Sequence, residues 1–175
     1  MTIRFYLLMG VAGCGKTTVG RALAERLGWA FYDADDYHPP ENAAKMAAGI
    51  PLEDEDRAGW LERLHDLILE CLKNEHPAVL ACSALKEKYR RVLLAKAQDV
   101  QLVYLRASYD LCRQRLTERR GHYMPVSLLA SQFEALEEPS NALVVDAGLP
   151  VRIVVGQILT GAAGSNSLLG RGGEN

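Results

Sequence analysis

The sequence predicts an α/β domain in which a parallel β-sheet is covered by helices on both faces. Two observations predict this class. Short apolar runs alternate with longer stretches whose apolar residues recur at helical spacing. A glycine-rich loop joins the first apolar run to the first helical stretch. This alternation of strands and helices implies right-handed crossovers and a parallel sheet. We expect a single domain over residues 1–160, with ligands at the carboxyl ends of its strands.

Composition excludes several classes of function. A net charge of −2 gives no general attraction to nucleic acid or to an anionic membrane, so any anion must be bound by local Lys and Arg. No apolar stretch approaches the ~18 residues of a transmembrane helix. The first strand begins by Ile3, which leaves no room for a signal peptide. Four scattered cysteines without metal-ligand spacing indicate reduced thiols in a cytoplasmic protein.

The first strand, residues 3–9, leads directly into a phosphate-binding motif. The segment Gly10-Val11-Ala12-Gly13-Cys14-Gly15-Lys16-Thr17 matches G-x-x-x-x-G-K-[ST], the loop of P-loop NTPases. Glycines let successive backbone N–H groups face one anion. Lys16 is expected to reach the β- and γ-phosphates of ATP, and the Thr17 hydroxyl to ligate Mg²⁺. We expect residues 10–18, including Thr18 in the following helix, to hold the nucleotide.

Two carboxylates follow the second strand, residues 29–32. Asp33 and Asp35 occupy alternate positions, so their side chains would point the same way in an extended chain. Phosphoryl transfer requires magnesium and a group that orients the attacking hydroxyl. We assign Asp33 to magnesium, mainly through a bound water, and Asp35 to the acceptor hydroxyl as base or hydrogen-bond acceptor. The alternative is a solvated turn or helix cap.

The remaining elements follow in alternation. A short helix covers 41–48, and a long helix begins near 54 with an apolar stripe from Trp60 to Leu72. The later strands are expected at 78–82, 100–105 and 143–145, and the later helices after Ser83, at 109–117, near 127–136 and from 151. The tail from Gly161 is rich in Gly, Ser and Asn, which predicts disorder over 161–175.

A series of shorter motifs lies outside the phosphate loop. They are Asp35-Asp36-Tyr37-His38-Pro39, Asn42, Lys45-Met46, Gly49-Ile50-Pro51-Leu52, Asp54, Asp56-Arg57, Trp60-Leu61, Cys82-Ser83-Ala84-Leu85-Lys86, Tyr89-Arg90, Gly121-His122, Gln132-Phe133-Glu134, Leu136-Glu137 and Pro139. Together they resemble the gluconokinase family of small sugar-acid kinases, from the first strand to about Pro139. The family often has serine at the position of Cys14, a change that leaves the loop amides in place.

The resemblance implies a fold and an activity. The fold is an adenylate- and shikimate-kinase-like five-stranded parallel sheet with a small lid, usually in a homodimer. The activity is ATP-dependent phosphorylation of D-gluconate to 6-phosphogluconate. The acceptor-binding insertion would span about 36–60 and the lid about 115–127.

Gluconate is a polyhydroxylated anion, so its site should combine a few cations with short polar side chains. Arg57 is suited to bidentate pairing with the carboxylate. Lys86 and Arg90, one helical turn apart, are expected to share a face. The substrate-binding candidates are Asp35, His38, Asn42, Lys45, Met46, Arg57, Lys86, Tyr89, Arg90 and His122. For each cation, an ordinary surface charge is the alternative.

Arginines precede the expected lid. Arg115 is assigned to the nucleotide and Arg119 to catalysis, with Arg120 beside it, because cations closing over ATP stabilise developing charge and exclude water. Residues 132–146 are candidates for contact with adenine but carry no decisive chemistry. Two further hypotheses stay open at this point: a kinase of another acceptor, such as shikimate or a nucleoside monophosphate, and a nucleotide-dependent switch.

Overall fold

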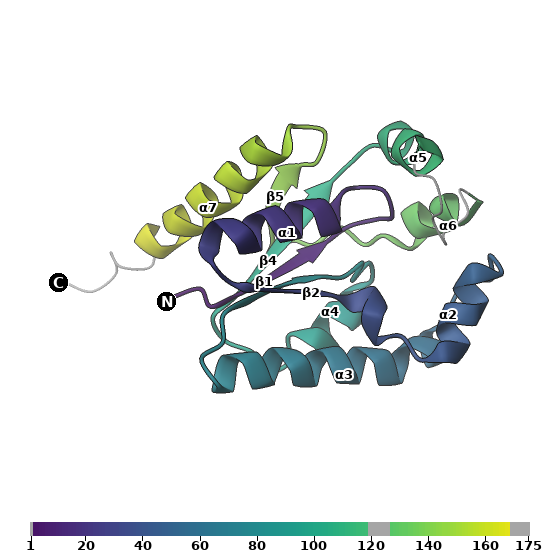
Figure 1. The fold of residues 1–175 in the computed structure, drawn as a ribbon, viewed down its shortest axis with the longest axis horizontal. Helices are drawn as coiled ribbons and strands as arrows, with labels where there is room; N and C mark the ends of the chain where they lie inside the picture. Colours follow the sequence, from purple (N-terminus) through teal and green to yellow (C-terminus); the bar gives the residue numbers. More distant parts are fainter. Residues whose placement is uncertain (1, 119–126, 169–175) are drawn as a thin grey trace.

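The computed structural model describes residues 2–118 and 127–168 and contains one parallel sheet (Figure 1). Its five strands lie in the order β2-β3-β1-β4-β5. They are β1 Phe5–Met9, β2 Ala30–Asp33, β3 Ala78–Ala81, β4 Val100–Arg106 and β5 Leu143–Asp146. Every neighbouring pair is parallel, which confirms the sheet expected from the alternation of strands and helices.

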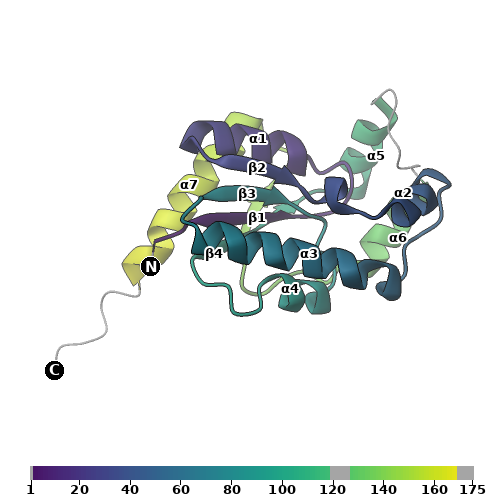
Figure 2. The same ribbon diagram turned by 60° about the horizontal axis from the view of Figure 1, so that its bottom comes forward.

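Helices cover both faces of this sheet. They are α1 Lys16–Leu27, α2 Pro40–Ala47, α3 Asp54–Lys73, α4 Glu87–Leu93, α5 Tyr109–Glu118, α6 Ser127–Ala135 and α7 Val151–Leu168, with a 3₁₀ helix η1 at Ala34–Tyr37. Helices α1 and α7 pack on one face of the sheet and α3 and α4 on the other; in Figure 1, α3 and α4 lie below the strands. After the rotation of Figure 2, α2, α5 and α6 are still grouped at the end of the sheet away from the two termini.

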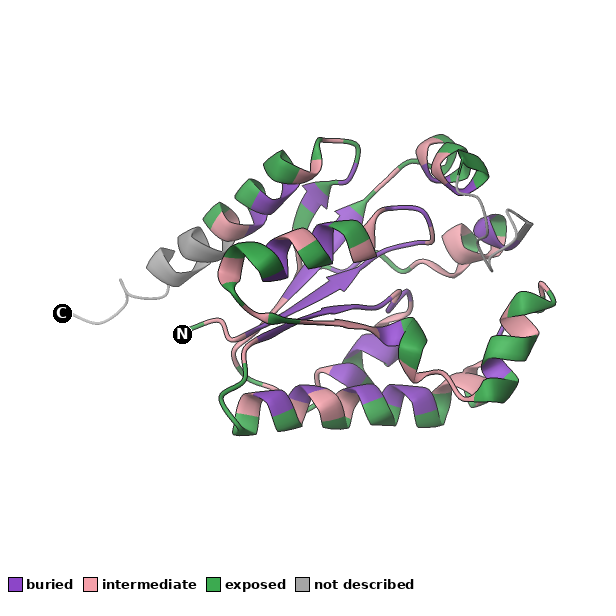
Figure 3. Cartoon of the chain, in the orientation of Figure 1, coloured by how far each residue is buried: buried purple, intermediate pink, exposed green. Residues whose placement is uncertain are grey.

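The central strand shows why the core has two halves. Alternate side chains of a strand point to opposite faces, and Tyr6 and Leu8 pack with α1 and α7 while Phe5, Leu7 and Met9 pack with α3 and α4. All of β1 is buried, as Figure 3 shows. A strand enclosed on both faces must be apolar throughout, which explains the uninterrupted apolar run in the sequence.

The last helix extends further than the sequence indicates. Disorder was predicted from Gly161, but α7 continues to Leu168, so that prediction is wrong for these residues. Gly161 packs against β5: a Cβ there would lie 2.7 Å from Leu143 Cδ1. The missing side chain therefore allows close helix–strand packing, which a composition argument does not detect. Residues 169–175 lie outside the described part.

The carboxyl ends of the strands meet at one edge. The Gly10 N–H donates to Ser83 O at 3.2 Å, joining the segments after β1 and β3. The Ala147 N–H donates to Arg106 O at 2.8 Å, joining those after β4 and β5. Within residues 2–118 and 127–168, no helix has both the length and the apolar character needed to span a membrane. The candidate functional residues are therefore brought together at this edge.

Candidate active site

The phosphate loop, residues 10–17, contains three glycines with positive φ, and two of them are packed too tightly for a larger residue. Gly10, Gly13 and Gly15 have φ values of 149°, 78° and 99°. A Cβ on Gly10 would lie 2.9 Å from Leu105 O, and one on Gly13 would lie 2.7 Å from Cys112 O. Backbone atoms of β4 and α5 therefore press against the loop from behind. Gly10 and Gly13 are therefore required by both conformation and space, whereas Gly15 is required by its positive φ alone.

Lys16 and Gln132 both contact backbone groups in the first half of the loop. Lys16 Nζ donates to Gly10 O and Val11 O, each at 3.0 Å, so the ammonium lies over the first turn of the loop. The Ala12 N–H donates to Gln132 Oε1 of α6 at 2.7 Å. Sequence reasoning placed Gln132 in a family motif without assigning it this contact.

Thr17 and Asp33, both assigned to magnesium, are in direct contact. Thr17 Oγ1 donates to Asp33 Oδ2 at 2.8 Å, which joins the first turn of α1 to the end of β2. Among the described residues there is no group of three or more His, Cys, Asp or Glu side chains that could hold a metal. Mg²⁺ in nucleotide sites takes one or two protein oxygens and completes its shell with phosphates and water. A hydroxyl and a carboxylate at this spacing fit that ion.

Asp35 reaches the site by a different route from the one expected. The expectation that Asp33 and Asp35 occupy alternate positions of an extended chain is wrong, because Asp35 lies in the 3₁₀ helix η1. Asp33 is the N-cap of that helix, and its Oδ1 accepts a hydrogen bond from the Asp35 N–H at 3.1 Å. Burial raises the pKa of the Cys82 thiol to about 12, with smaller effects from Asp35, Lys16 and Asp33. Both carboxylates and Lys16 therefore lie near the end of β3.

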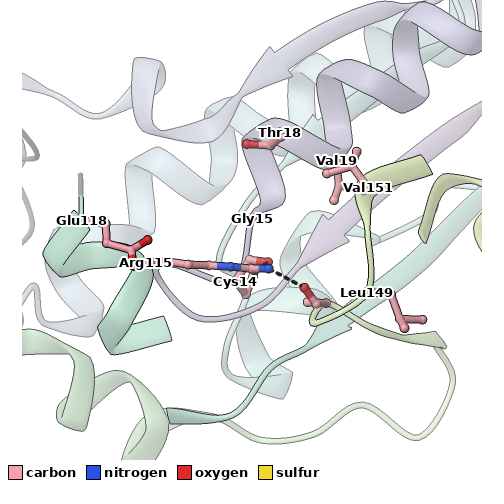
Figure 4. Close-up of a pocket in the computed structure, with 9 residues that line it drawn as sticks. Cys14, Gly15, Thr18, Val19, Arg115, Glu118, Leu149 and Val151 are labelled. Carbon is pink, nitrogen blue, oxygen red and sulfur yellow. Dashed lines mark hydrogen bonds between the residues drawn. The ribbon is translucent and has the colours of Figure 1, made fainter. Parts of the chain in front are cut away.

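A cavity of about 320 Å³ opens beside the loop (Figure 4). It is lined by Cys14, Gly15, Thr18, Val19, Arg115, Glu118, Ala147, Leu149 and Val151. Arg115 bridges its two sides, donating to Cys14 O at 3.1 Å and to Ala147 O at 2.9 Å. Apolar walls and a flat guanidinium suit a planar aromatic ligand. Sequence reasoning missed residues 147–151, although their position after the fifth strand marks them as part of the same edge.

The second half of the site is a lobe formed by α2 and the first turns of α3 and α4. Asn42 is buried and donates to Asp56 O at 2.7 Å. Lys45 Nζ lies 2.7 Å from Asp56 Oδ1, and this contact holds the pKa of that carboxyl below its usual value. Asn42 and Lys45 thus join α2 to α3. Met46 follows on α2 and is partly buried.

His38 is positioned by stacking. Its ring lies parallel to Trp60, with centroids 4.2 Å apart, and Nδ1 is 3.4 Å from Asn42 Nδ2. Burial, with a smaller effect from Arg57, lowers the pKa of His38 to about 4. The imidazole is therefore neutral at pH 7. A neutral ring can exchange hydrogen bonds with a hydroxylated ligand but cannot supply positive charge.

Asp54 links the start of α3 to three side chains at the start of α4. It accepts hydrogen bonds from Lys88, Tyr89 and Lys86, the last at 3.1 Å. These contacts, led by Lys88, hold the pKa of the Asp54 carboxyl well below its usual range. The Arg57 guanidinium lies 5.5 Å from the centroid of the Tyr89 ring and donates to Leu52 O. Arg57, Lys86 and Tyr89 are therefore close together, as their shared assignment requires.

Arg90 departs from the expected arrangement. Its side chain is 3% exposed, and Nη1 donates to Ala84 O and Leu85 O, each at 2.9 Å. Lys86 precedes the first turn of α4 with extended φ and ψ of −94° and 146°. The Lys86 side chain reaches outward to Asp54 at 3.1 Å while that of Arg90 turns into the core, so the expectation of a shared face is wrong. Arg90 fixes the turn after β3, where Ala84 adopts a left-handed φ of 44°.

The expected lid spans about residues 115–127, and part of it lies outside the described residues. Arg119, Arg120, Gly121 and His122 lie outside the described residues. Arg115, the first of the three arginines expected near the lid, lies within the described residues. It contacts the phosphate loop by donating to Cys14 O.

Comparisons with known proteins show a consistent likeness. The profile of the shikimate kinase family matches residues 12–141. A probable gluconokinase from Mus musculus is 50% identical over 151 residues, covering 77% of this chain and 82% of that protein. The solved gluconokinase from Sinorhizobium meliloti is 39% identical, with a TM-score of 0.83 and 97% of each chain covered. A solved shikimate kinase from Aquifex aeolicus shares the fold at 19% identity, with a TM-score of 0.62 and coverage of 93% of this chain and 98% of that one.

Proposed function

The chain belongs to the gluconokinase family, within the wider group of shikimate-kinase-like P-loop kinases, and we propose that it transfers the γ-phosphoryl group of ATP to D-gluconate. The products are 6-phospho-D-gluconate and ADP. The observation that carries the proposal is the position of two cations, Arg57 of α3 and Lys86 before α4, which both lie against the ring of Tyr89. A neutral acceptor would not require such a pair of cations, whereas a sugar acid does.

ATP binding is assigned to the loop side of the site. The base enters the cavity bounded by Arg115 and residues 147–151, and the phosphates follow the loop amides toward Lys16. Helix α1 begins at Lys16, so its N-terminal amides add to the attraction for phosphate. In the transition state Lys16 compensates charge that develops on the transferred group.

Transfer is assigned to the carboxylates at the end of β2. Thr17 and Asp33 would hold Mg²⁺, Asp33 in part through water, and the ion supplies charge neutralisation for the phosphates. Asp35 accepts the proton of the attacking hydroxyl, or orients it by a hydrogen bond. Arg119 is proposed to assist from the lid as a catalytic cation.

Acceptor binding is assigned to the lobe. Arg57 and Lys86 take the carboxylate of gluconate, and Tyr89 stacks beneath them. His38, neutral at pH 7, hydrogen-bonds to a hydroxyl, while Asn42 and Lys45 fix the wall formed by α2. Met46 and His122 are proposed to complete the contacts. Arg90 supports this site through the turn after β3 rather than by touching the acceptor.

Shikimate is the second candidate acceptor, because the shikimate kinase profile matches most of the chain. It too is a hydroxylated carboxylate. Gluconate is favoured by the greater likeness to gluconokinases. We also propose a cytoplasmic homodimer: the dimer follows from the family resemblance, and the reducing compartment agrees with four buried cysteines that form no disulfide.

An acceptor panel tests the proposal. The purified chain is incubated with ATP, Mg²⁺ and either D-gluconate, shikimate or AMP, and ADP release is coupled to NADH oxidation. Gluconate is expected to raise ADP release far above the rate without acceptor, with the product identified by ³¹P NMR as a phosphate monoester on the terminal carbon. Turnover with shikimate or AMP but not with gluconate would reject the assignment.

A further inference from the structure

Gln132 links α6 to the phosphate loop. Its Oε1 accepts a hydrogen bond of 2.7 Å from the Ala12 N–H, across 120 positions of sequence. A backbone amide in a phosphate loop is a group that would otherwise be directed at phosphate or water. The contact therefore decides the orientation of one amide in the loop.

Helix α6 provides a firm base for this side chain. Leu129, one turn before Gln132, is fully buried, and Leu128 is nearly so. Phe133 packs edge-on against Tyr109 of α5, with ring centroids 5.5 Å apart. Because α6 is held by buried leucines before Gln132 and by the partly buried Phe133 after it, the carboxamide can restrain the loop rather than follow it.

The Ala12 amide, which Gln132 contacts, lies at the end of the loop away from the cavity assigned to the base. The cavity assigned to the base is lined by Gly15, Thr18 and Val19. Lys16 Nζ, in contrast, lies over the carbonyls of Gly10 and Val11, directly before Ala12. Since the lysine of this motif reaches the β- and γ-phosphates, the turn at Ala12 lies at the γ-phosphate end.

We propose that Gln132 is a positioning residue that holds the γ-phosphate end of the loop in shape, and that it thereby favours ATP over ADP. It acts through the Ala12 amide. Without this restraint the turn gains freedom that ATP binding must remove, whereas ADP, which ends at the β-phosphate, does not engage this turn. The inference rests on the proposed use of ATP and is independent of the acceptor.

Calorimetric titration with a non-hydrolysable ATP analogue, AMP-PNP, and separately with ADP, both with Mg²⁺, tests this role. Gln132→Met keeps the length of the side chain and removes the acceptor oxygen. The Kd for AMP-PNP is expected to rise about 5-fold, the effect of one lost hydrogen bond, while the Kd for ADP changes less than about 2-fold. In steady state, KM for ATP should rise more than kcat falls. Equal weakening of both nucleotides, or weakening of neither, would overturn the proposal.

Two further variants sharpen the result. Gln132→Glu keeps the acceptor oxygen but adds negative charge, so it should also weaken AMP-PNP more than ADP; unchanged AMP-PNP affinity would place Gln132 away from the γ-phosphate and refute the inference. Gln157→Met is the matched control, since Gln157 lies on α7, is exposed and is not among the residues that line the nucleotide cavity. It should leave both affinities unchanged. No acceptor is present in these titrations, so failure of the gluconate assignment would not alter their outcome.

Discussion

The phosphate loop and the acceptor lobe are built in different ways. The loop is made of backbone, held by three glycines and by contacts with β4 and α5. The lobe is made of side chains that hold one another, with Lys45 on Asp56 and Lys86 on Asp54. Charges in the loop are directed at a nucleotide common to many enzymes, whereas charges in the lobe must recognise one acceptor. Generic binding is therefore encoded in backbone conformation, and specificity in a side-chain network that spans three segments.

The largest effect is expected in the loop half. Lys16→Ala should lower kcat by about 1,000-fold, because charge on the transferred phosphoryl group is no longer compensated. Folding should persist, since Lys16 Nζ contacts carbonyls of its own loop. The measurement is the coupled assay together with a thermal melt. A kcat within about 10-fold of wild type would remove Lys16 from the transition state.

Asp35 lies between the phosphate loop and the acceptor lobe, and Asp35→Asn tests its role in transfer. It should lower kcat by about 100-fold by removing the base, with little change in the KM for either substrate. Asp36→Asn is the matched control, because Asp36 is the next residue of η1 and is exposed. Similar losses in both variants would indicate a general effect on η1 rather than proton transfer at Asp35.

Arg57→Lys tests whether the lobe binds the acceptor independently of the nucleotide. It should raise KM for gluconate by about 10-fold, because lysine cannot pair a carboxylate in bidentate fashion, and leave KM for ATP unchanged. Arg63→Lys, further along α3 and exposed, serves as the control. A rise in KM for ATP that matches the rise for gluconate would contradict the separation of the two halves.

The smallest effect concerns the pH response of the lobe. The pKa of His38 is lowered from 6.5 to about 4, so between these values the unfolded chain binds more protons than the folded one. The free energy of unfolding should therefore fall as pH falls from about 6.5 toward about 4. His38→Phe, which keeps a ring on Trp60, should make this decline shallower in urea titrations at several pH values.

His76→Phe is the control for that experiment, because His76 is exposed, and it should leave the decline unchanged. The ¹H–¹³C NMR signal of His38 provides a direct check. Titration of that signal near 6.5 would show that the ring is not buried against Trp60 as described.

The loop half could be largely predicted from the sequence, because its groups are contiguous. Gly10, Lys16 and Thr17 belong to one motif, and each strand end follows an apolar run. The expected sheet and helices on both faces are confirmed. Among the elements of the fold, the end of α7 was not predicted, since the packing of Gly161 on Leu143 is a long-range contact that local composition does not reveal.

The lobe could be predicted only as a set of candidates. Their partners lie on different helices, so the sequence did not show that Asp54 would gather Lys86 and Tyr89. Nor did it show that Arg90 would turn inward to the carbonyls of residues 84 and 85. The sequence places Gln132 in a family motif but does not predict its contact, because its partner is a backbone amide far away in the chain.

The measurement that tests the central claim most directly compares two acceptors that differ only at the carboxylate. D-gluconate and D-sorbitol share the hydroxyl chain, but sorbitol carries a neutral CH₂OH where gluconate is charged. If the cationic lobe selects the acceptor, kcat/KM with wild-type enzyme should be at least about 100-fold higher for gluconate. Values for the two acceptors within about 2-fold of each other would contradict a site built around the carboxylate.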